Sequence, residues 1–258
     1  GAALATTIAR FIEMMFIILT VYLGKNMVAA KIKEMINFSL ETVKTYFVTS
    51  WSVILNELIW SIGLSTYAVA YAKIGTAAVA TMQIANTLNN MFLVFLSGMA
   101  SAASIIIGNN IGAGDEERAL DYSNKIAKLS ILSGFILGVI VWFTAPIVVK
   151  PFSVTEETAQ SVINVLRIMG VFFTLRSYNM VMIVGVFRGG GDTTYAMVLQ
   201  GCTIWFYSVP LSFIGAMFLH LPVEIVFILI SSEDIIKAIF QSKRVKTGKW
   251  LKNVVAAI

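Results

Sequence analysis

The chain has 258 residues, of which 58% are hydrophobic and 13% charged, and its mean hydropathy is +0.83. Soluble domains average about 45–50% apolar and 25% charged residues, so the composition excludes an ordinary soluble protein and predicts an integral membrane protein. The net charge of +5 would suggest nucleic-acid binding in a soluble chain. In a membrane protein it indicates instead on which side of the bilayer the basic residues lie, and no nucleic-acid partner is predicted.

Cysteine and histidine are scarce. The single cysteine, Cys202, excludes an internal disulfide, and the single histidine, His220, leaves no His/Cys metal cluster. Catalysis would need a nucleophile beside a base, or a metal, and the sequence contains no such pattern. We therefore predict no metal site, no cofactor and no enzymatic activity.

Seven apolar stretches are long enough to cross a bilayer, which requires about 20 mostly apolar residues. We predict an all-α integral membrane protein with seven transmembrane helices, at Ala2–Leu23, Phe47–Tyr71, Ala77–Ile107, Ile126–Val149, Val162–Phe187, Tyr195–Leu219 and Val223–Phe240. The first stretch follows Gly1 directly, without an initiating methionine or a signal-peptide cleavage pattern. We therefore expect a fragment of a longer protein.

The connection Gly24–Tyr46 has apolar residues at intervals of three and four and lysines on its other faces, which is typical of a helix in the membrane interface. We interpret it as a linker, with a lipid sensor as the alternative. Of the alternate connections, one side has only Lys73 and Lys150. The other side has Lys25, Lys31, Lys33, Lys44, Arg118, Lys125, Lys128, Arg188, Lys243, Arg244, Lys246, Lys249 and Lys252. The positive-inside rule predicts that this side, with the C-terminus, is cytoplasmic.

Charged residues deep in the membrane are the candidate functional residues, because each costs several kcal/mol unless it is paired or hydrated. At 1.5 Å per residue, Glu57 lies about 20 Å from Lys44 and Arg176 about 18 Å from Arg188, the nearest cytoplasmic basic residues. Equal depth predicts a buried Glu57–Arg176 pair. Either the pair is structural, or Glu57 is a protonatable or cation-binding carboxylate that faces a cavity. Further polar lining is predicted from Asn56, Gln83, Asn86, Asn90, Asn179 and Gln200.

Two shorter patterns predict ion pairs within single helices. Glu233 and Lys237, four residues apart on the last helix, occupy one face and form a secondary charge pair near the cytoplasmic half of the cavity. Arg10 and Glu13 are similarly close on the first helix. Such pairs neutralise each other, so pairing is the favoured role over transport.

The segment Gly185–Thr194, GVFRGGGDTT, predicts a tight hairpin between two membrane helices. Its three glycines can adopt positive φ, Arg188 suits the C-terminal end of a helix, and Asp192 can cap the next helix. We expect Gly190 to occupy a positive-φ position. A solvated structural turn is the simplest interpretation.

Several of these motifs together resemble one protein family. The R-G-G-G-D-T turn is followed by W-x-x-x-V-P-L-x-F-x-G-A, and the chain also contains ILNELIWSIG, GNNIGAGDEER and TGKWLKN in order. In this order and spacing they resemble the second half of the multidrug and toxic compound extrusion (MATE) transporters. Each motif is weak by itself, but the five extend over most of the chain.

The resemblance implies twelve helices in two six-helix lobes, and hence a domain order. Residues 1–23 would be the last helix of the N-terminal lobe, 24–46 a cytoplasmic amphipathic linker, 47–241 the C-terminal lobe and 242–258 a basic cytoplasmic tail. The missing N-terminal lobe of the same protein would be a partner of this chain. The resemblance also implies location in the bacterial cytoplasmic membrane.

The resemblance further implies an antiporter that exports organic, often cationic, drug-like compounds in exchange for H⁺ or Na⁺ by alternating access of the two lobes. Glu57 matches an acidic position that many members use for cation coupling, and Asn179 lies where members place polar cavity residues. One branch has a second acidic residue before that asparagine, but here Arg176 and its neighbours occupy the region. Aromatic and methionine side chains would supply an adaptable apolar wall.

Two other functions stay open as alternatives. A flippase for lipid-linked precursors would need a cavity rich in basic residues, for which mainly Arg176 is available. A seven-helix receptor or photoreceptor is suggested only by helix count. Lys237 is the only lysine within the last helix and lies toward its cytoplasmic end, which is unsuited to a retinal Schiff base.

Overall fold

The computed structural model describes residues 2–24, 29 and 39–252, in which helices are joined by short turns and no strand occurs. These residues fall into two compact units, Gly1–Thr49 and Ser50–Ile258. The first unit contains α1 (Ala2–Leu23), whose described side chains are almost all exposed within that unit. The predicted pair on α1 is present, with Arg10 Nη1 2.7 Å from Glu13 Oε2.

Most of the predicted linker lies outside the described residues. Its last part, Leu40–Tyr46, forms the first turns of α3 (Leu40–Ile74), a continuous helix whose apolar span begins only at Ser50. Leu40–Tyr46 are therefore helical and continuous with α3, and the role of residues 24–46 as a linker between lobes stays a prediction.

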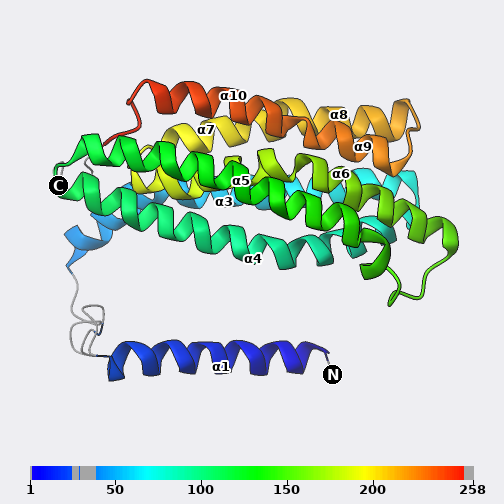
Figure 1. The fold of residues 1–258 in the computed structure, drawn as a ribbon, viewed down its shortest axis with the longest axis horizontal. Helices are drawn as coiled ribbons and strands as arrows, with labels where there is room; N and C mark the ends of the chain where they lie inside the picture. Colours follow the sequence, from blue (N-terminus) through cyan, green and yellow to red (C-terminus); the bar gives the residue numbers. More distant parts are fainter. Residues whose placement is uncertain (1, 25–28, 30–38, 253–258) are drawn as a thin grey trace. The chain divides into compact units, whose positions relative to one another are not determined.

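The second unit contains α3 from Ser50 onward and the remaining helices, which lie alongside one another (Figure 1). They are α4 (Thr76–Gly112), α5 (Glu116–Val148), α6 (Glu156–Met180), α7 (Thr193–Thr203), α8 (Val209–Phe213), α9 (Val223–Ser231) and α10 (Glu233–Lys246). Three π-helical segments continue α6, α7 and α8: η1 (Val181–Phe187), η2 (Ile204–Ser208) and η3 (Ile214–Phe218).

Six helices among the described residues are long and apolar enough to cross a membrane, and they overlap the first six predicted stretches. The seventh stretch is divided, because α9 ends at Ser231 and α10 begins at Glu233. The hydroxyl of Ser232 donates to the carbonyl of Leu229 at 2.6 Å, a local bond that competes with regular helix. The all-helical membrane fold is confirmed, with a broken last helix that hydropathy did not indicate.

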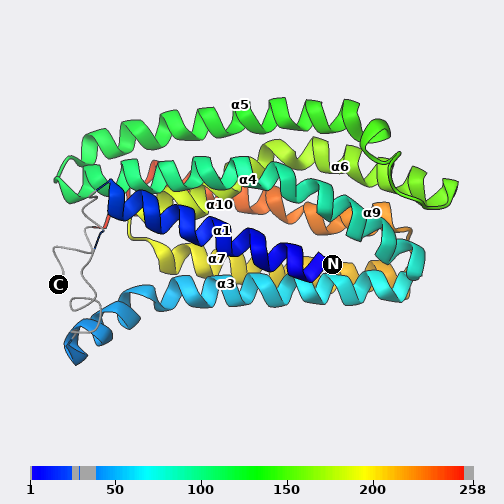
Figure 2. The same cartoon turned by 90° about the horizontal axis from the view of Figure 1, so that it is seen from below.

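α6 is the central helix of the second unit. In its most apolar stretch of 18 residues, which includes part of η1 in the same span, 61% of the residues are buried, compared with 22% in the corresponding stretches of α3, α4 and α5. α6 contacts α4, α5, α9 and α10. The view from below shows α5 and α4 running along it (Figure 2). Glycines allow this approach: a Cβ on Gly138 would lie 2.3 Å from the carbonyl oxygen of Gly170. The core is thus built around the helix that carries Arg176 and Asn179.

Candidate functional site: two buried charge clusters

The turn after η1 carries a buried carboxylate that binds two cations. Asp192, which is 1% exposed, accepts from Arg244 Nε at 2.8 Å and from Lys252 Nζ at 2.5 Å. Arg244 also stacks on the ring of Tyr195, 4.7 Å from its centroid, and donates to the carbonyl of Lys249. Asp192 precedes α7 as predicted, but its side chain makes no capping bond. The capping prediction is therefore wrong, because the carboxylate binds charged donors instead.

The glycines of this turn have different roles. Gly191 adopts the predicted positive φ, at 78°, whereas Gly190 does not appear among the positive-φ glycines. A Cβ on Gly190 would instead lie 2.4 Å from Trp250 Cε3, and its carbonyl accepts from the backbone nitrogen of Lys252 at 2.8 Å. Trp250 is fully buried. The positive-φ explanation was therefore wrong for Gly190, which is small because an indole packs on it.

RGGGDT and the described part of TGKWLKN, Thr247–Lys252, are two of the motifs that carry the family resemblance, and they consequently form one structure. We call it the terminal latch and define it as Gly190, Asp192, Arg244, Trp250 and Lys252. It joins the turn between η1 and α7 to the end of α10. Both carboxylate oxygens of Asp192 accept a hydrogen bond from a cationic side chain.

Glu57 pairs with Arg188, not with Arg176, so the predicted Glu57–Arg176 pair is wrong. α3 starts before Lys44, and its apolar span begins at Ser50, so Lys44 does not mark the membrane boundary. Counted from Ser50, Glu57 lies about 10 Å inside the span. At this depth the long side chain of Arg188, which directly follows η1, reaches the carboxylate of Glu57. The Glu57 side chain is 52% exposed.

A second cluster lies where α9 meets α10. Glu233 accepts from Lys237 Nζ at 2.7 Å on one oxygen, and from Ser208 Oγ at 2.6 Å and Tyr67 Oη at 3.4 Å on the other. The predicted Glu233–Lys237 pair is thus present, with side chains 12% and 7% exposed. Glu233 is also in the first turn of α10, where the helix dipole stabilises a carboxylate. Its negative charge is fully compensated.

Asp234 extends this cluster to α6. Asn179 Nδ2 donates both to the backbone carbonyl and to Oδ1 of Asp234, at 2.9 Å each. Arg176 Nε lies 3.7 Å from Oδ2, which is an ion pair but too long for a hydrogen bond. Two predicted cavity residues therefore meet a carboxylate that was not predicted to bind them. We call Glu233, Asp234, Lys237, Arg176, Asn179, Tyr67 and Ser208 the helix-break cluster.

The other predicted lining residues are separate from it. Asn56 and Gln200 are buried, whereas Gln83, Asn86 and Asn90 are exposed on α4. No side-chain hydrogen bond among the described residues joins any of these five to the helix-break cluster. They remain predicted, not demonstrated, cavity residues.

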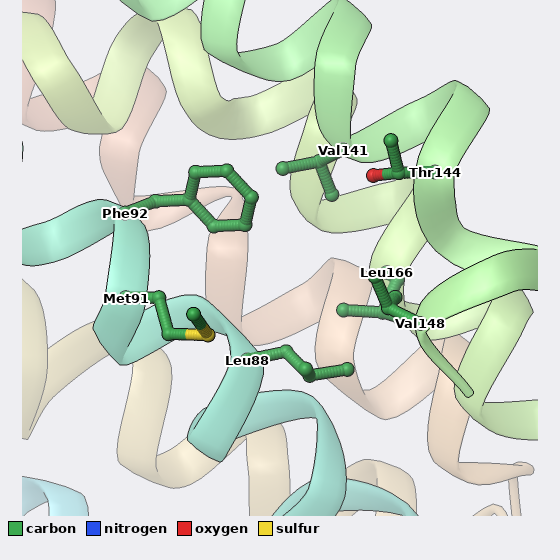
Figure 3. Close-up of a pocket in the computed structure, with 7 residues that line it drawn as sticks. All are labelled: Leu88, Met91, Phe92, Val141, Thr144, Val148 and Leu166. Atoms are coloured by element: carbon green, nitrogen blue, oxygen red, sulfur yellow. The ribbon is translucent and has the colours of Figure 1, made fainter. Parts of the chain in front are cut away.

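An apolar pocket of about 310 Å³ lies between α4, α5 and α6, away from both clusters. Figure 3 shows Leu88, Met91 and Phe92 of α4 opposite side chains of α5 and α6. Thr144 is the one hydroxyl among its lining residues. The pocket can accept an apolar group, and it includes two of the methionine and aromatic side chains expected to form an adaptable wall.

The family follows from comparison with known proteins. A profile of the family described as MatE matches residues 52–214, more than half of the chain. The chain belongs to the MatE family. Because MATE proteins are membrane transporters, the predicted family and fold class are confirmed.

The relatives of this MatE chain are distant and longer. It is 22% identical, over 99% of its length, to a probable multidrug resistance protein NorM of Thermotoga maritima, covering 54% of that protein. Over 55% of its length it is 27% identical to a probable NorM of Halalkalibacterium halodurans, covering 31% of that protein. The chain therefore spans about half, or less, of the curated relatives it matches.

Solved structures have the same fold. A crystal structure of a MATE protein in complex with MaL6 matches 96% of the chain with a TM-score of 0.77 at 21% identity, over 57% of its own length. A MOP superfamily transporter from Pyrococcus furiosus, for which the reverse polarity of the binding pocket suggests a different function, matches 96% of the chain with a TM-score of 0.76 at 22% identity, also over 57% of its own length.

Sequence reasoning missed the interhelical partners in this MatE chain. No binding role was predicted for Asp234, Tyr67 or Ser208. One signal was available: Ser231, Ser232, Glu233 and Asp234 place four consecutive polar residues inside an apolar run. Such a run interrupts a membrane helix only where other side chains satisfy it.

Proposed function

We propose that this MatE chain is part of a secondary active efflux antiporter that exports organic, often cationic, compounds in exchange for H⁺ or Na⁺. The proposal rests on two ion pairs inside the helix bundle of a MATE family member. Glu233 pairs with Lys237, and Asp234 pairs with Arg176, between membrane-length helices. Buried ionisable groups in membrane spans are expensive and typically serve transport. The relatives' names, probable multidrug resistance proteins, support the substrate class.

The transport path would lie between this lobe and a companion lobe, because the relatives are about twice as long as the matched region. Two lobes that rock about a central site would expose it alternately to each side of the membrane. We propose the bacterial cytoplasmic membrane as its location. The basic end of α10 and the terminal latch would then face the cytoplasm.

Glu57 is the proposed coupling carboxylate. Its half-exposed side chain is accessible from the surface of the lobe, and its partner Arg188 is itself 23% exposed. A proton or Na⁺ that binds Glu57 would displace Arg188 and weaken the link between α3 and the end of η1. A ligand changes a conformational equilibrium only through such a difference in contacts.

Transport in vesicles tests this proposal. Glu57→Gln retains size and hydrogen-bonding capacity but cannot change charge, so efflux driven by an imposed pH or sodium gradient should fall at least about tenfold. The two gradients are imposed separately on the intact protein. Glu13→Gln is the matched control, because Glu13 is also an exposed glutamate paired with an arginine on a membrane-length helix.

Folding is measured in parallel. Because both partners of the Glu57 pair are partly exposed, Glu57→Gln should leave expression and melting temperature near normal. Wild-type efflux with an unchanged ion dependence in a well-folded Glu57→Gln protein would exclude the coupling role.

The structure gives the flippase alternative less support. That function depended on Arg176 for binding a pyrophosphate, and Arg176 is already opposed by Asp234. Efflux of a cationic dye without movement of labelled lipid would favour the antiporter.

A further inference from the structure

Arg167 is a basic side chain at membrane depth that has no anionic partner in the described part of the chain. It lies in α6, about 16 Å along the helix from Glu156, inside a span that is long and apolar enough to cross a membrane. Arg176 of the same helix pairs with Asp234, whereas no described carboxylate pairs with Arg167. Its Nε is buried and has no hydrogen-bond partner. Because an uncompensated charge in a bilayer is expensive, this guanidinium requires an anion from elsewhere.

The indole ring of Trp142 on α5 supports Arg167. The guanidinium carbon lies 5.7 Å from the ring centroid, which is within the range of a cation–π contact. α5 and α6 approach closely here, since a Cβ on Gly170 would lie 3.5 Å from the backbone nitrogen of Trp142. Trp142 is 42% exposed, so the pair lies at the open edge of the contact between the two helices and not in the core. A neutral ring orients a guanidinium but leaves its charge uncompensated.

Polar side chains continue from Arg167 toward the beginning of α6. Gln160 and Asn164 precede it by seven and three residues, a spacing that places all three on one face of the helix. Gln160 Nε2 donates to Asn164 Oδ1 at 3.1 Å, which leaves the amide nitrogen of Asn164 as a donor one turn from Arg167. Side chains on a helix tilt toward its N-terminus. Arg167 is therefore directed along this polar column to the membrane interface at which α6 begins.

Toward the middle of the membrane the same surface is apolar. Val171, four residues after Arg167 on the same face of α6, is 63% exposed. On α5, Val139 and Phe135 precede Trp142 by three and seven residues, so they continue its face in the same direction, and both are exposed. We call these residues, with the polar column of α6, the α5–α6 seam. The seam changes from polar to apolar at the level of Arg167, in the order in which a membrane lipid presents its headgroup and its acyl chains.

We propose that the α5–α6 seam binds an anionic membrane phospholipid, whose phosphate pairs with Arg167 and whose acyl chain lies along Val171 and Val139. The phosphate contacts the terminal guanidinium nitrogens, because Nε is enclosed whereas the side chain as a whole is half-buried. Arginine presents these nitrogens as a planar fork that matches two phosphate oxygens. A headgroup with net negative charge neutralises Arg167, whereas a choline headgroup brings its own cation.

The apolar part of the seam favours a lipid over a soluble anion. A free phosphate has to leave water to reach a guanidinium at this depth, whereas the phosphate of a lipid already lies at the interface and its acyl chain matches the exposed apolar side chains below. The lipid then bridges α5 and α6 near the beginning of α6. The terminal latch lies at the other end of the same span, after η1, so the two contacts stabilise opposite ends of the lobe.

Quenching of tryptophan fluorescence by brominated lipids tests the site in the intact protein. The protein is reconstituted in phosphatidylcholine vesicles with increasing fractions of dibrominated phosphatidylglycerol or, separately, of dibrominated phosphatidylcholine. The quenching that disappears in Trp142→Phe reports on Trp142. For this part, phosphatidylglycerol should act at about fivefold lower mole fraction, as expected for one basic residue at a lipid surface. Arg167→Gln should abolish the preference. Lys150→Gln, which removes an exposed lysine from the turn before α6, is the control and should retain it.

Arg167→Met keeps the proposal testable if Arg167→Gln fails to fold, because methionine is an unbranched apolar side chain that suits a membrane span. A preference that survives either variant, or one that is lost equally in Lys150→Gln, would overturn the proposal. Equal quenching by the two lipids in the wild type would also overturn it, and is the result expected if a carboxylate of the companion lobe neutralises Arg167. Relief of the quenching by excess glycerophosphate would assign the site to a soluble phosphate instead of a lipid.

Discussion

Asp192 and Asp234 are both buried aspartates, but they are satisfied very differently. Asp192 binds one cation on each oxygen, and the terminal latch around it is closed by a fully buried tryptophan. Asp234 has one oxygen bound to Asn179 and one that only faces Arg176 without a hydrogen bond. Burial alone therefore does not distinguish a structural carboxylate from one that can bind a ligand. The two are distinguished by the number of hydrogen-bond donors that contact each carboxylate oxygen.

This difference has an energetic consequence. A saturated carboxylate gains hydrogen bonds that are lost when it is removed, and its partners are then left without compensation. A carboxylate with an oxygen that accepts no hydrogen bond already lacks part of this stabilisation in the folded protein. Substitutions should therefore cost most stability where donors are most numerous and least at Asp234.

Glu233 should show the largest effect, because it accepts from three donors and faces a lysine that is only 7% exposed. Glu233→Gln leaves Lys237 buried and uncompensated, which should lower the free energy of unfolding by about 3–5 kcal/mol. The measurement is SDS-induced unfolding of the purified protein, followed by tryptophan fluorescence.

A double variant separates charge from packing. Glu233→Gln combined with Lys237→Met removes both charges and should recover most of the lost stability, since neutral pairs of similar volume can replace a buried ion pair. If the double variant is as unstable as the single one, the interaction with Lys237 is not what stabilises Glu233.

Gly190→Val should have the next largest effect. The new side chain would overlap Trp250, whose Cε3 and carbonyl oxygen would lie 2.4 and 2.9 Å from the added Cβ. Overpacking of this kind typically costs about 1–3 kcal/mol, so folded yield should fall while the substrate profile of the remaining protein stays the same.

Gly98→Ala is the control for Gly190, because a Cβ there meets nothing within 4 Å. Its yield should equal that of the wild type or exceed it slightly. Normal expression of Gly190→Val with an altered substrate profile would contradict a structural role for the latch.

The sequence was sufficient for the features that depend on neighbouring residues in one helix. Hydropathy located the apolar stretches, and i, i+4 spacing located the Glu233–Lys237 pair, because both follow from helix geometry alone. The break at Ser232 was not predicted. The four polar residues Ser231–Asp234 lie within a longer apolar run, and the polar side chains that stabilise the break come from another segment of the chain, at Ser208 and Tyr207.

Pairs between helices could not be derived from depth. Depth gives one coordinate of a side chain, whereas contact also depends on the rotation of each helix and on which helices are neighbours. Arg176 consequently pairs with Asp234 and not with Glu57. The error in the depth of Glu57 had a separate cause, because α3 continues beyond the membrane span and its lysine was taken as the boundary.

Asp192→Asn should have an intermediate effect. The substitution removes the charge that binds two cations, but Arg244 and Lys252 are 21% and 49% exposed and can regain solvent. We expect a loss of about 1–2 kcal/mol in the free energy of unfolding. Limited proteolysis should also cleave the chain after α10 more rapidly, since the segment Thr247–Lys252 would lose an anchor. Unchanged cleavage would show that Trp250 and the backbone hydrogen bond from Lys252 to Gly190 hold this segment without the charge of Asp192.

Asp234→Asn should have the smallest effect on stability, although Asp234 is nearly as buried as Asp192. Asparagine can still accept from Asn179 through its remaining oxygen, no hydrogen bond from Arg176 is lost, and Arg176 can turn toward its 30% exposed side. We expect a loss of about 1 kcal/mol or less, measured by the same SDS-induced unfolding in choline buffer, without sodium. A loss as large as that of Asp192→Asn in choline would show that the oxygen near Arg176 is a structural contact, and the distinction between the two aspartates would fail.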